Sequence, residues 1–537
     1  MSGRRKHNEE RIRLRMNEDK STTELHSSFY GSLGRYQWQQ YFLHVLPAFT
    51  AGVHMLSQVT VGASPDHKCI SPLPLNSSEL EDVCYVETEE GLEKCMEWEY
   101  DQTYYGSTIV TEWDLVCDRR WMRAAAQSIF MFGVLFGAAI LGPMADKYGR
   151  MKIFYASSVL QVLFGVGAAF CYHYIAFVIC KFFLGMFGSA GAYVTGFVLT
   201  MEMVGPKYRT ALGFGMQAIF DVGGMVVAGW GVLIKDWNLL QLVYGLHGAI
   251  LLGHWWLTDE SVYWLYTKGE KEKAKEIVQK GMKVNKLKAS VSESDMEKIF
   301  SVADTKEKYG IMDLLRTPRM RLRILNVCLN WFANSIVFYG LSLNTDTLLK
   351  GDPFLMLFLV TLPGLPSYVL TPILVDRFGR RDITSTFMMV GGLACIIAAF
   401  IPKDTTAGST AVITMVMIGK FFIAGSFAII YNYTAELFPT VVRSSAMGSG
   451  AMCARLSGAL TPLISLLDSF DPKLPSVIFG TISLISGFLT LFLPETLGKT
   501  MPQTLEEGES LGLGDRRRCF GSSIQQNERA SVASDTV

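Results

Sequence analysis

Charged residues are scarce in this chain of 537 amino acids. Asp, Glu, Lys and Arg together make up 18% of it, 50% of its residues are apolar, and its mean hydropathy is +0.25. This composition excludes a soluble multidomain protein, a collagen, a disordered chain and a small disulfide-rich scaffold. The net charge is zero because 49 basic residues balance 49 acidic ones, so no charge excess indicates a nucleic-acid partner.

Motifs of enzymes and of metal sites are also missing. The eight histidines form no HExxH pair. The sequence Gly498-Lys499-Thr500 resembles the end of a phosphate-binding loop, but the first glycine of that loop falls at Leu493, and no strand is expected before it. We therefore expect no enzyme, no metal and no cofactor, so that energy for any transport comes from substrate or ion gradients.

Long apolar segments, in contrast, are abundant. The apolar core of a membrane is about 30 Å thick and requires about 20 apolar residues per helix. Twelve segments meet this requirement: Trp38–Val61, Met122–Met144, Ile153–Cys171, Ile175–Met201, Ala211–Ile234, Leu239–Leu257, Leu322–Asn344, Phe354–Val375, Ile383–Ile401, Ala411–Tyr433, Ser445–Leu466 and Ser476–Leu493. The sequence therefore predicts an all-α membrane protein with twelve transmembrane helices.

The basic residues set the expected orientation. An even number of spans places both termini on one side, and the N-terminal tail is basic without a following signal peptide. Several loops on that side are also basic, whereas each short loop on the other side has at most one lysine: Lys235, Lys350, Lys403 or Lys473. Both termini are therefore expected in the cytosol of a plasma-membrane protein.

The chain is expected to have five parts, and two soluble segments interrupt its spans. The five parts are a cytosolic tail at 1–37, a six-helix bundle at 38–257 with an extracellular loop at 62–121, a cytosolic linker at 258–321, a second six-helix bundle at 322–493 and a cytosolic tail at 494–537. Within the linker, residues 270–288 have the pattern of a solvated amphipathic helix.

The extracellular loop contains four cysteines and a glycosylation sequon. Cys69, Cys84, Cys95 and Cys117 in an oxidising compartment predict two disulfides, with three pairings open, and the alternative is that some stay free. Asn76 begins the sequon Asn-Ser-Ser and is the predicted glycosylation site.

Two motifs occur once in each half of the chain. Asp-Lys-Tyr-Gly-Arg at 146–150 closes span two, and Asp-Arg-Phe-Gly-Arg at 376–380 closes span eight, about 230 positions later. Glu202 and Arg209 after span four have the same spacing as Glu436 and Arg443 after span ten. Six-span repeats are typical of alternating-access transporters.

These motifs predict a cytosolic gate. Each Asp is expected where the dipole of the next helix favours an anion, and a nearby Arg or Lys can pair with it, so that ion pairs latch the cytosolic faces together. The expected gate residues are Asp146, Arg150, Glu202, Arg209, Asp376, Arg380, Glu436 and Arg443. The alternative is that the basic residues serve only to set the orientation.

With these paired motifs the chain resembles the major facilitator superfamily. The segments Thr111–Cys117, Tyr433–Thr440 and Leu493–Gly498 resemble its solute carrier family of organic cation, organic anion and carnitine transporters. The resemblance implies the major facilitator fold, with two six-helix pseudo-repeats. It fails after span six, where the family's PESPRWL is replaced by Asp-Glu-Ser-Val-Tyr-Trp-Leu at 259–265, which leaves a weakened cytosolic contact there open.

Ionisable residues inside spans are costly and therefore indicate function. Asp221 and Arg455 each lie ten residues into a span, about 15 Å deep, and Lys420 has a similar depth. A guanidinium binds carboxylates and a buried Asp attracts an ammonium, so this pair suits a zwitterion. The alternative is a permanent structural pair of Asp221 with Lys420 or Arg455. Lys181 lies nearer the outer end of its span and is expected to snorkel.

Aromatic and amide side chains complete the expected substrate site. Ring faces attract organic cations, and the candidates are Trp331, Phe338 and Tyr339 in span seven and Phe427 and Tyr431 in span ten. Asn330 and Asn334 lie on one face of span seven, where they line the path or hydrogen-bond between helices. By resemblance, an arginine at the position of Arg455 is typical of the anion and carnitine branches. The negative charge of Asp221 does not fit a site for anions alone.

The sequence therefore predicts a secondary transporter of small organic ions, most of all cations or zwitterions of the carnitine or biogenic-amine kind. An organic-anion exchanger and a membrane sensor that binds without transport are the alternatives. Besides substrate and lipid, the final residues Ser534–Val537 suggest a PDZ-type partner. Substrate, coupling ion, direction and oligomeric state do not follow from the sequence.

Overall fold

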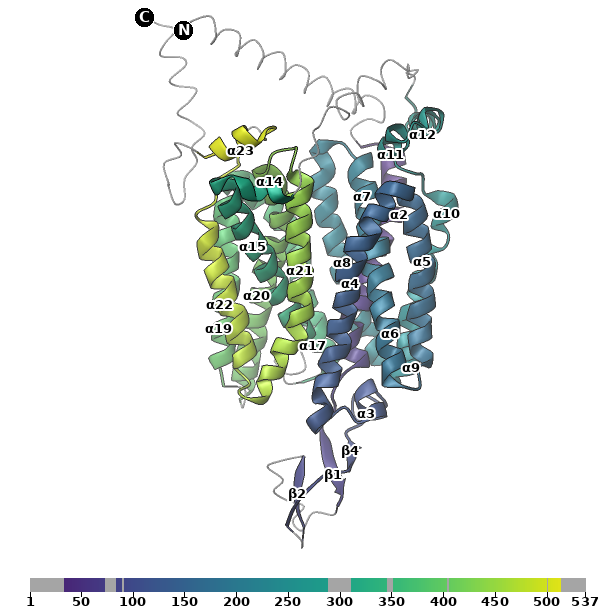
Figure 1. Ribbon diagram of the computed structural model, residues 1–537. Helices are drawn as coiled ribbons and strands as arrows, with labels where there is room; N and C mark the ends of the chain where they lie inside the picture. Colours follow the sequence, from purple (N-terminus) through teal and green to yellow (C-terminus); the bar gives the residue numbers. More distant parts are fainter. Residues whose placement is uncertain are drawn as a thin grey trace, which may run out of the picture.

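The computed structural model describes residues 33–72, 84–88, 91–287, 311–344, 351–402, 405–499 and 501–512. Long, roughly parallel helices form two groups side by side, one coloured purple to blue and the other green to yellow, and short strands extend from one end (Figure 1). We call this the strand end, and the opposite end, beside which α12 and α23 lie, the linker end.

The first group contains the helices that precede the linker. They are α2 (Arg35–Val61), α4 (Arg120–Tyr148), α5 (Arg150–Gly167), the continuous run α6 (Tyr174–Leu184), η3 (Gly185–Tyr193) and α7 (Val194–Met203), then α8 (Pro206–Leu233), α9 (Trp237–His247), η4 (Gly248–Leu251) and α10 (His254–Leu257). The segment η3 is a π-helix between two α-helices.

The second group contains the helices that follow the linker. They are α15 (Pro318–Leu343), α17 (Pro353–Thr361), α18 (Gly364–Phe378), α19 (Arg380–Phe400), α20 (Thr406–Leu437), α21 (Arg443–Ser465) with η6 (Leu466–Ser469), and α22 (Leu474–Thr490). Four of the helices in the two groups, α8, α15, α17 and α22, have a proline in their first turn, where its missing N–H costs no hydrogen bond.

The membrane-spanning prediction is confirmed at the level of the fold. Ten described segments are long and apolar enough to cross a membrane, and Leu474–Thr490 is a shorter apolar helix. The predicted span Leu239–Leu257 is not one α-helix but the series α9, η4 and α10. Glycines at 245, 248 and 253 explain this difference, because glycine weakens a helix by about 1 kcal/mol relative to alanine.

The segment at the strand end departs from an all-α description. Strand β1 (His67–Ser71) pairs antiparallel with β4 (Glu97–Tyr100), and β2 (Tyr85–Thr88) pairs antiparallel with β3 (Gly91–Lys94). Short strands of this kind need a covalent or packed support. The disulfides Cys69–Cys95 and Cys84–Cys117 supply it, one of the three pairings left open by the sequence. Asn76 lies outside the described residues.

The linker and the last helix form short elements at the linker end. They are α11 (Val262–Thr267), α12 (Lys271–Val284), α14 (Ile311–Arg316) and α23 (Leu505–Ser510). The amphipathic pattern predicted from residue 270 corresponds to α12, whose face with Ala274, Val278 and Met282 is buried in a cluster with Tyr36 and Trp264. That face therefore attaches the linker to the first group.

The two groups meet most closely toward the strand end. Arg120 at the start of α4 and Asp468 in η6 form an ion pair of 2.7 Å between Nη2 and Oδ2. On the other side of the interface, a Cβ at Gly231 in α8 would overlap the ring of Phe354 in α17. These contacts bring α4 against α21 and α8 against α17 and α18.

The disulfides should stabilise the strand-end segment independently of the helices. They link cysteines 26 and 33 positions apart, a loop size for which stabilisation is about 3 to 4 kcal/mol. Peptide mapping without reduction should recover the pairs Cys69–Cys95 and Cys84–Cys117. Cys95→Ser should lower the yield of folded protein, whereas Cys171→Ser, a half-buried free thiol, should not. Recovery of four unlinked thiols would contradict the assignment.

Candidate functional site

A small cavity lies between the two groups, halfway along the helices. Its lining comes from both groups and includes Tyr193 and Gln217 from the first and Tyr339, Tyr431 and Arg455 from the second. Its free volume is about 50 Å³, whereas sites for small organic ligands span about 300 to 1,000 Å³. This conformation is therefore closed around the cavity.

Arg455 is the only ionised side chain among the described residues that line the cavity. Its Nη1 donates a 3.4 Å hydrogen bond to the Ala451 carbonyl oxygen one turn earlier in α21, and its Nε has no partner. The guanidinium therefore keeps unused donors at the cavity, in the planar arrangement that binds a carboxylate with two hydrogen bonds.

Four of the five predicted aromatic residues line the same cavity: Phe338, Tyr339, Phe427 and Tyr431. The ring centroids of Phe338 and Phe427 are 5.7 Å apart, so the rings form one continuous apolar wall. Trp331 does not line it. Its indole N–H donates to Thr434 Oγ1 at 3.1 Å, and its ring lies 4.3 Å from that of Tyr431, which it supports from behind.

The two predicted asparagines of α15, Asn330 and Asn334, do not line the cavity. Asn330 Oδ1 accepts a 2.8 Å hydrogen bond from the Thr490 hydroxyl of α22, and Asn334 Nδ2 donates to the Asn330 carbonyl oxygen at 2.9 Å. Asn334 Nδ2 also lies 3.6 Å from Met388 Sδ of α19. The alternative for the two residues, hydrogen bonding between helices, therefore describes their place in this conformation.

Asp221 and Lys420 are fully buried outside the cavity lining. Lys420 Nζ donates to Ser342 Oγ at 2.6 Å and lies 3.1 Å from the centroid of the Phe338 ring. Neither carboxylate oxygen of Asp221 has a hydrogen-bond partner. Of the two residues expected to flank one cavity, only Arg455 lines it in this conformation. Asp221 forms no ion pair with Lys420 or Arg455.

Lys181 does not snorkel in this structure. Its side chain is 1% exposed, because it turns into the first group, where Nζ donates to Ser57 Oγ at 3.1 Å. Lys181 and Lys420 thus share one arrangement, a buried ammonium bonded to a serine near the strand end of the first helix of its own group, and neither lines the cavity.

Four polar residues of the cavity were missed from the sequence: Ser189, Tyr193, Gln217 and Ser335. Gln217 precedes Asp221 by four positions in α8, so the helical period places both toward one face and was a usable signal. Tyr193 lies in the π-helix η3, whose irregular turn has no recognisable sequence pattern.

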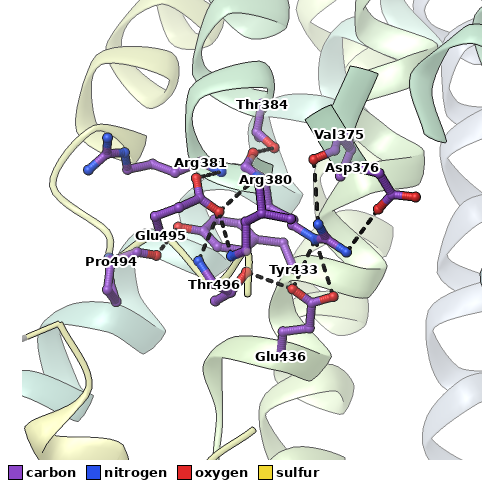
Figure 2. Close-up of polar contacts among 11 residues, drawn as sticks. Val375, Asp376, Arg380, Arg381, Thr384, Tyr433, Glu436, Pro494, Glu495 and Thr496 are labelled. Atoms are coloured by element: carbon purple, nitrogen blue, oxygen red, sulfur yellow. Dashed lines mark hydrogen bonds and ion pairs between the residues drawn. The ribbon is translucent and has the colours of Figure 1, made fainter. Parts of the chain in front are cut away.

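The predicted gate residues form one cluster in each group at the linker end. Arg150 contacts Glu202 at 2.8 Å and Asp146 at 3.3 Å. In the second group Arg380 contacts Glu436 at 3.1 Å and Asp376 at 3.2 Å, as Figure 2 shows. Each of these pairs lies within one group, so in this conformation they do not latch the two groups together.

The acidic residues expected at the next helix's N-terminus are not the ones found there. Asp146 and Asp376 have side chains 68% and 73% exposed. Glu260 accepts hydrogen bonds from the Met151 backbone N–H at the start of α5, and Glu495 accepts from the first two N–H groups of α19 (Figure 2). A carboxylate there satisfies free N–H groups and the helix dipole.

Glycine makes this approach possible at both sites. Gly149 and Gly379 have φ of 117° and 100°, and a Cβ at either would crowd the capping glutamate. Burial raises the pKa of Glu260, against the backbone hydrogen bonds that lower it. The altered sequence after α10 therefore keeps its contact at the linker end, because Glu260 caps α5 and the Trp264 indole N–H donates to the Asp146 carbonyl oxygen at 2.8 Å.

Arg209 and Arg443 do not pair directly with the Glu of their own motif. Arg209 Nε donates to the Val204 carbonyl oxygen at 3.0 Å, and Arg443 Nε and Nη2 have no hydrogen-bond partner. Their partners Glu202 and Glu436 bind Arg150 and Arg380 instead. The equal spacing of the two motifs therefore reflects the repeat and not a local ion pair.

Comparison with known proteins agrees with this architecture. The family described as "Sugar (and other) transporter" matches residues 96–507. The XylE proton:xylose symporter bound to 6-bromo-6-deoxy-D-glucose has a TM-score of 0.60 at 18% identity, covering 89% of this chain and 99% of that one. XylE from E. coli in a partially occluded inward open conformation has a TM-score of 0.60 at 17% identity, covering 87% and 99%. These structures show the major facilitator fold, and with it the twelve-helix arrangement predicted above.

Curated relatives match nearly the full chain. "Organic cation transporter protein" of Drosophila melanogaster is 38% identical, covering 90% of this chain and 93% of that protein. Human "Solute carrier family 22 member 16" is 34% identical, covering 90% and 92%, and human "Organic cation/carnitine transporter 2" is 31% identical, covering 90% and 93%. The chain therefore belongs to the major facilitator superfamily, as a multi-pass membrane transporter and not an enzyme, in the solute carrier family of organic cation and carnitine transporters.

Proposed function

We propose that this transporter moves small organic ions that carry a carboxylate, with carnitine-like zwitterions as the main class. The observation that supports this proposal best is Arg455 at a cavity whose wall is otherwise aromatic, amide, hydroxyl and aliphatic. A substrate carboxylate would take the unused guanidinium donors, and a substituted ammonium would rest on the rings of Phe427, Tyr339 and Tyr431.

An organic-anion exchanger is the second candidate. The observation that favours it is that none of the described residues lining the cavity is an acid, so an ammonium finds rings but no carboxylate. Asp221 lies behind the lining, close enough to act electrostatically on Tyr193 and Tyr339. Its negative charge would favour a zwitterion over a simple anion, and for this reason we place the zwitterion first.

The proposed orientation puts both termini and the linker in the cytosol and the strand end outside, at the plasma membrane. Its support is the excess of basic residues at the linker end. In that orientation the ion pair of Arg120 with Asp468 lies at the outer end, and the two clusters around Arg150 and Arg380 lie at the inner end. The structure then corresponds to an inward-facing state with a collapsed cavity.

The bundles at 38–257 and 322–493 are proposed as the two units that rock about the cavity, joined by the linker at 258–321. In the outward-facing state the inner clusters would meet across the interface, where the exposed carboxylates of Asp146 and Asp376, each paired here with the arginine of its own cluster, would turn to the opposite unit. The proposed PDZ-type partner at Ser534–Val537 and the tails fall outside the described residues.

Removing the guanidinium should separate substrates by charge. Arg455→Ala should weaken uptake of a carboxylate-bearing zwitterion about 10- to 100-fold, since hydrogen bonds to charged groups contribute about 1.5 to 3 kcal/mol, and should affect a matched amine without a carboxylate much less. Uptake is measured in cells at equal surface level. Arg377→Ala, which removes an exposed arginine from the end of α18, is the control. Equal losses for zwitterion and amine would refute the carboxylate site.

Single charge removals at the two ends should shift the conformational equilibrium in opposite directions. Asp468→Asn breaks the outer pair and should populate the outward-facing state, whereas Asp146→Asn weakens the inner contacts proposed for that state and should populate the inward-facing one. Labelling of single cysteines from each side of the membrane reports both shifts. The exchange Arg120→Asp with Asp468→Arg should restore the wild-type pattern. Shifts in the same direction for both single variants would count against this scheme.

A further inference from the structure

Asp221 is a buried carboxylate that the proposed substrate site does not use. Its residue is 0% exposed in the middle of α8, and neither Oδ1 nor Oδ2 accepts a hydrogen bond. An ionised carboxylate without partners in an apolar interior is strongly unfavourable, so buried acids are paired, bind a cation or take up a proton.

The surroundings of Asp221 come mainly from the opposite group of helices. In α18, a Cβ at Gly364 would overlap Asp221 Oδ2, so the carboxylate lies directly against the backbone of the other unit. The Tyr368 phenol, also of α18, interacts with it electrostatically without meeting hydrogen-bond geometry. Asp221 thus lies at the contact of α8 with α18, a contact between the two groups.

The charged and titratable groups that face Asp221 leave it unpaired. They are Lys420 from α20, Tyr368 from α18, Tyr193 from η3 and Tyr339 from α15. Lys420 is the cation among them, and its ammonium is held by Ser342 Oγ at 2.6 Å and by the face of the Phe338 ring. Lys420 and Tyr368 act on the Asp221 charge electrostatically, but none of these groups forms an ion pair with it in this conformation.

We propose that Asp221 binds the proton that drives this transporter. This inference rests on the proposed transport function and adds its coupling ion. A proton from water on one side of the membrane forms an O–H bond with a carboxylate oxygen, and the neutral carboxyl fits the dry contact with Gly364. The proton binds while α8 and α18 are apart and water from the outer side reaches the carboxylate. It is released after closure, when water from the opposite end of the interface reaches the carboxyl and the O–H bond breaks.

The position of Asp221 couples proton binding to the closure of α8 against α18, and not to a direct contact between Asp221 and the substrate. Closing α8 against α18 desolvates Asp221, so closure is unfavourable while the carboxylate is charged and becomes favourable once it is neutral. Substrate binds at Arg455 in the neighbouring cavity, which closes with the same interface. Proton and substrate would thus cross together because both are required for the same closure.

The test uses the full chain in proteoliposomes with the membrane potential clamped at zero. An inward pH gradient should drive accumulation of a labelled zwitterion, about tenfold for each pH unit if one proton moves per substrate, since one pH unit is a tenfold proton ratio. A pH-sensitive dye inside the vesicles should report proton entry together with uptake. Asp221→Asn, which mimics the neutral carboxyl, should abolish both the accumulation and the proton entry while exchange continues at a reduced rate.

Control variants separate the outcomes. Asp471→Asn, which removes an exposed carboxylate between η6 and α22, should keep the pH-driven accumulation. Accumulation driven by Na⁺ in place of the pH gradient, or full pH drive in Asp221→Asn, would overturn the proton site. If Asp221→Asn and Lys420→Gln each fail to fold and the double variant recovers, the two residues are a structural pair, which also overturns it. Absence of exchange in wild-type vesicles would instead refute the proposed substrate class.

Discussion

An ionised side chain inside an apolar helix bundle needs a partner, and most of the arrangement described here follows from how each charge obtains one. Lys181 and Lys420 each turn toward a serine on the first helix of their own group. At the linker end, Arg150 and Arg380 each contact two carboxylates of their own group. Arg455 keeps unused donors at the central cavity, and Asp221 has no partner at all. Arg455 and Asp221 both lie between the two groups, so two of the charges without a full set of partners are found at that interface.

The two halves use the same devices at equivalent positions. In each half a positive-φ glycine ends one helix, an arginine begins the next, and a glutamate from the segment after the last helix caps that arginine's helix. The cap joins residues 109 positions apart in the first half and 115 in the second. A local turn is thereby tied to the end of its own group, which stiffens each group at the linker end.

The sequence predicted what depends on composition and on single charges. Runs of about 20 apolar residues located the spans, because the bilayer thickness sets that length, and a lone arginine in a span was enough to identify Arg455. It did not show that Trp331 and Asn330 point away from the cavity, because the helical period gives a face but not the neighbour that the face meets. Nor did it show that Glu260 caps α5, since no local pattern reveals a contact across 109 positions.

The π-helix η3 interrupts the regular winding of the fourth span, which is otherwise one continuous helix. Its turns are wider than those of an α-helix. The nine residues Gly185–Tyr193 therefore make fewer turns than the same number of residues in an α-helix would make. A return of this segment to α-helical turns at unchanged length would rotate everything after it, because an α-helix turns by about 100° per residue and a π-helix by less. Glu202 would then leave Arg150, and the cluster at the linker end would come apart without any change in its own residues. The winding of this segment, more than its composition, sets the phase between the central cavity and the linker end.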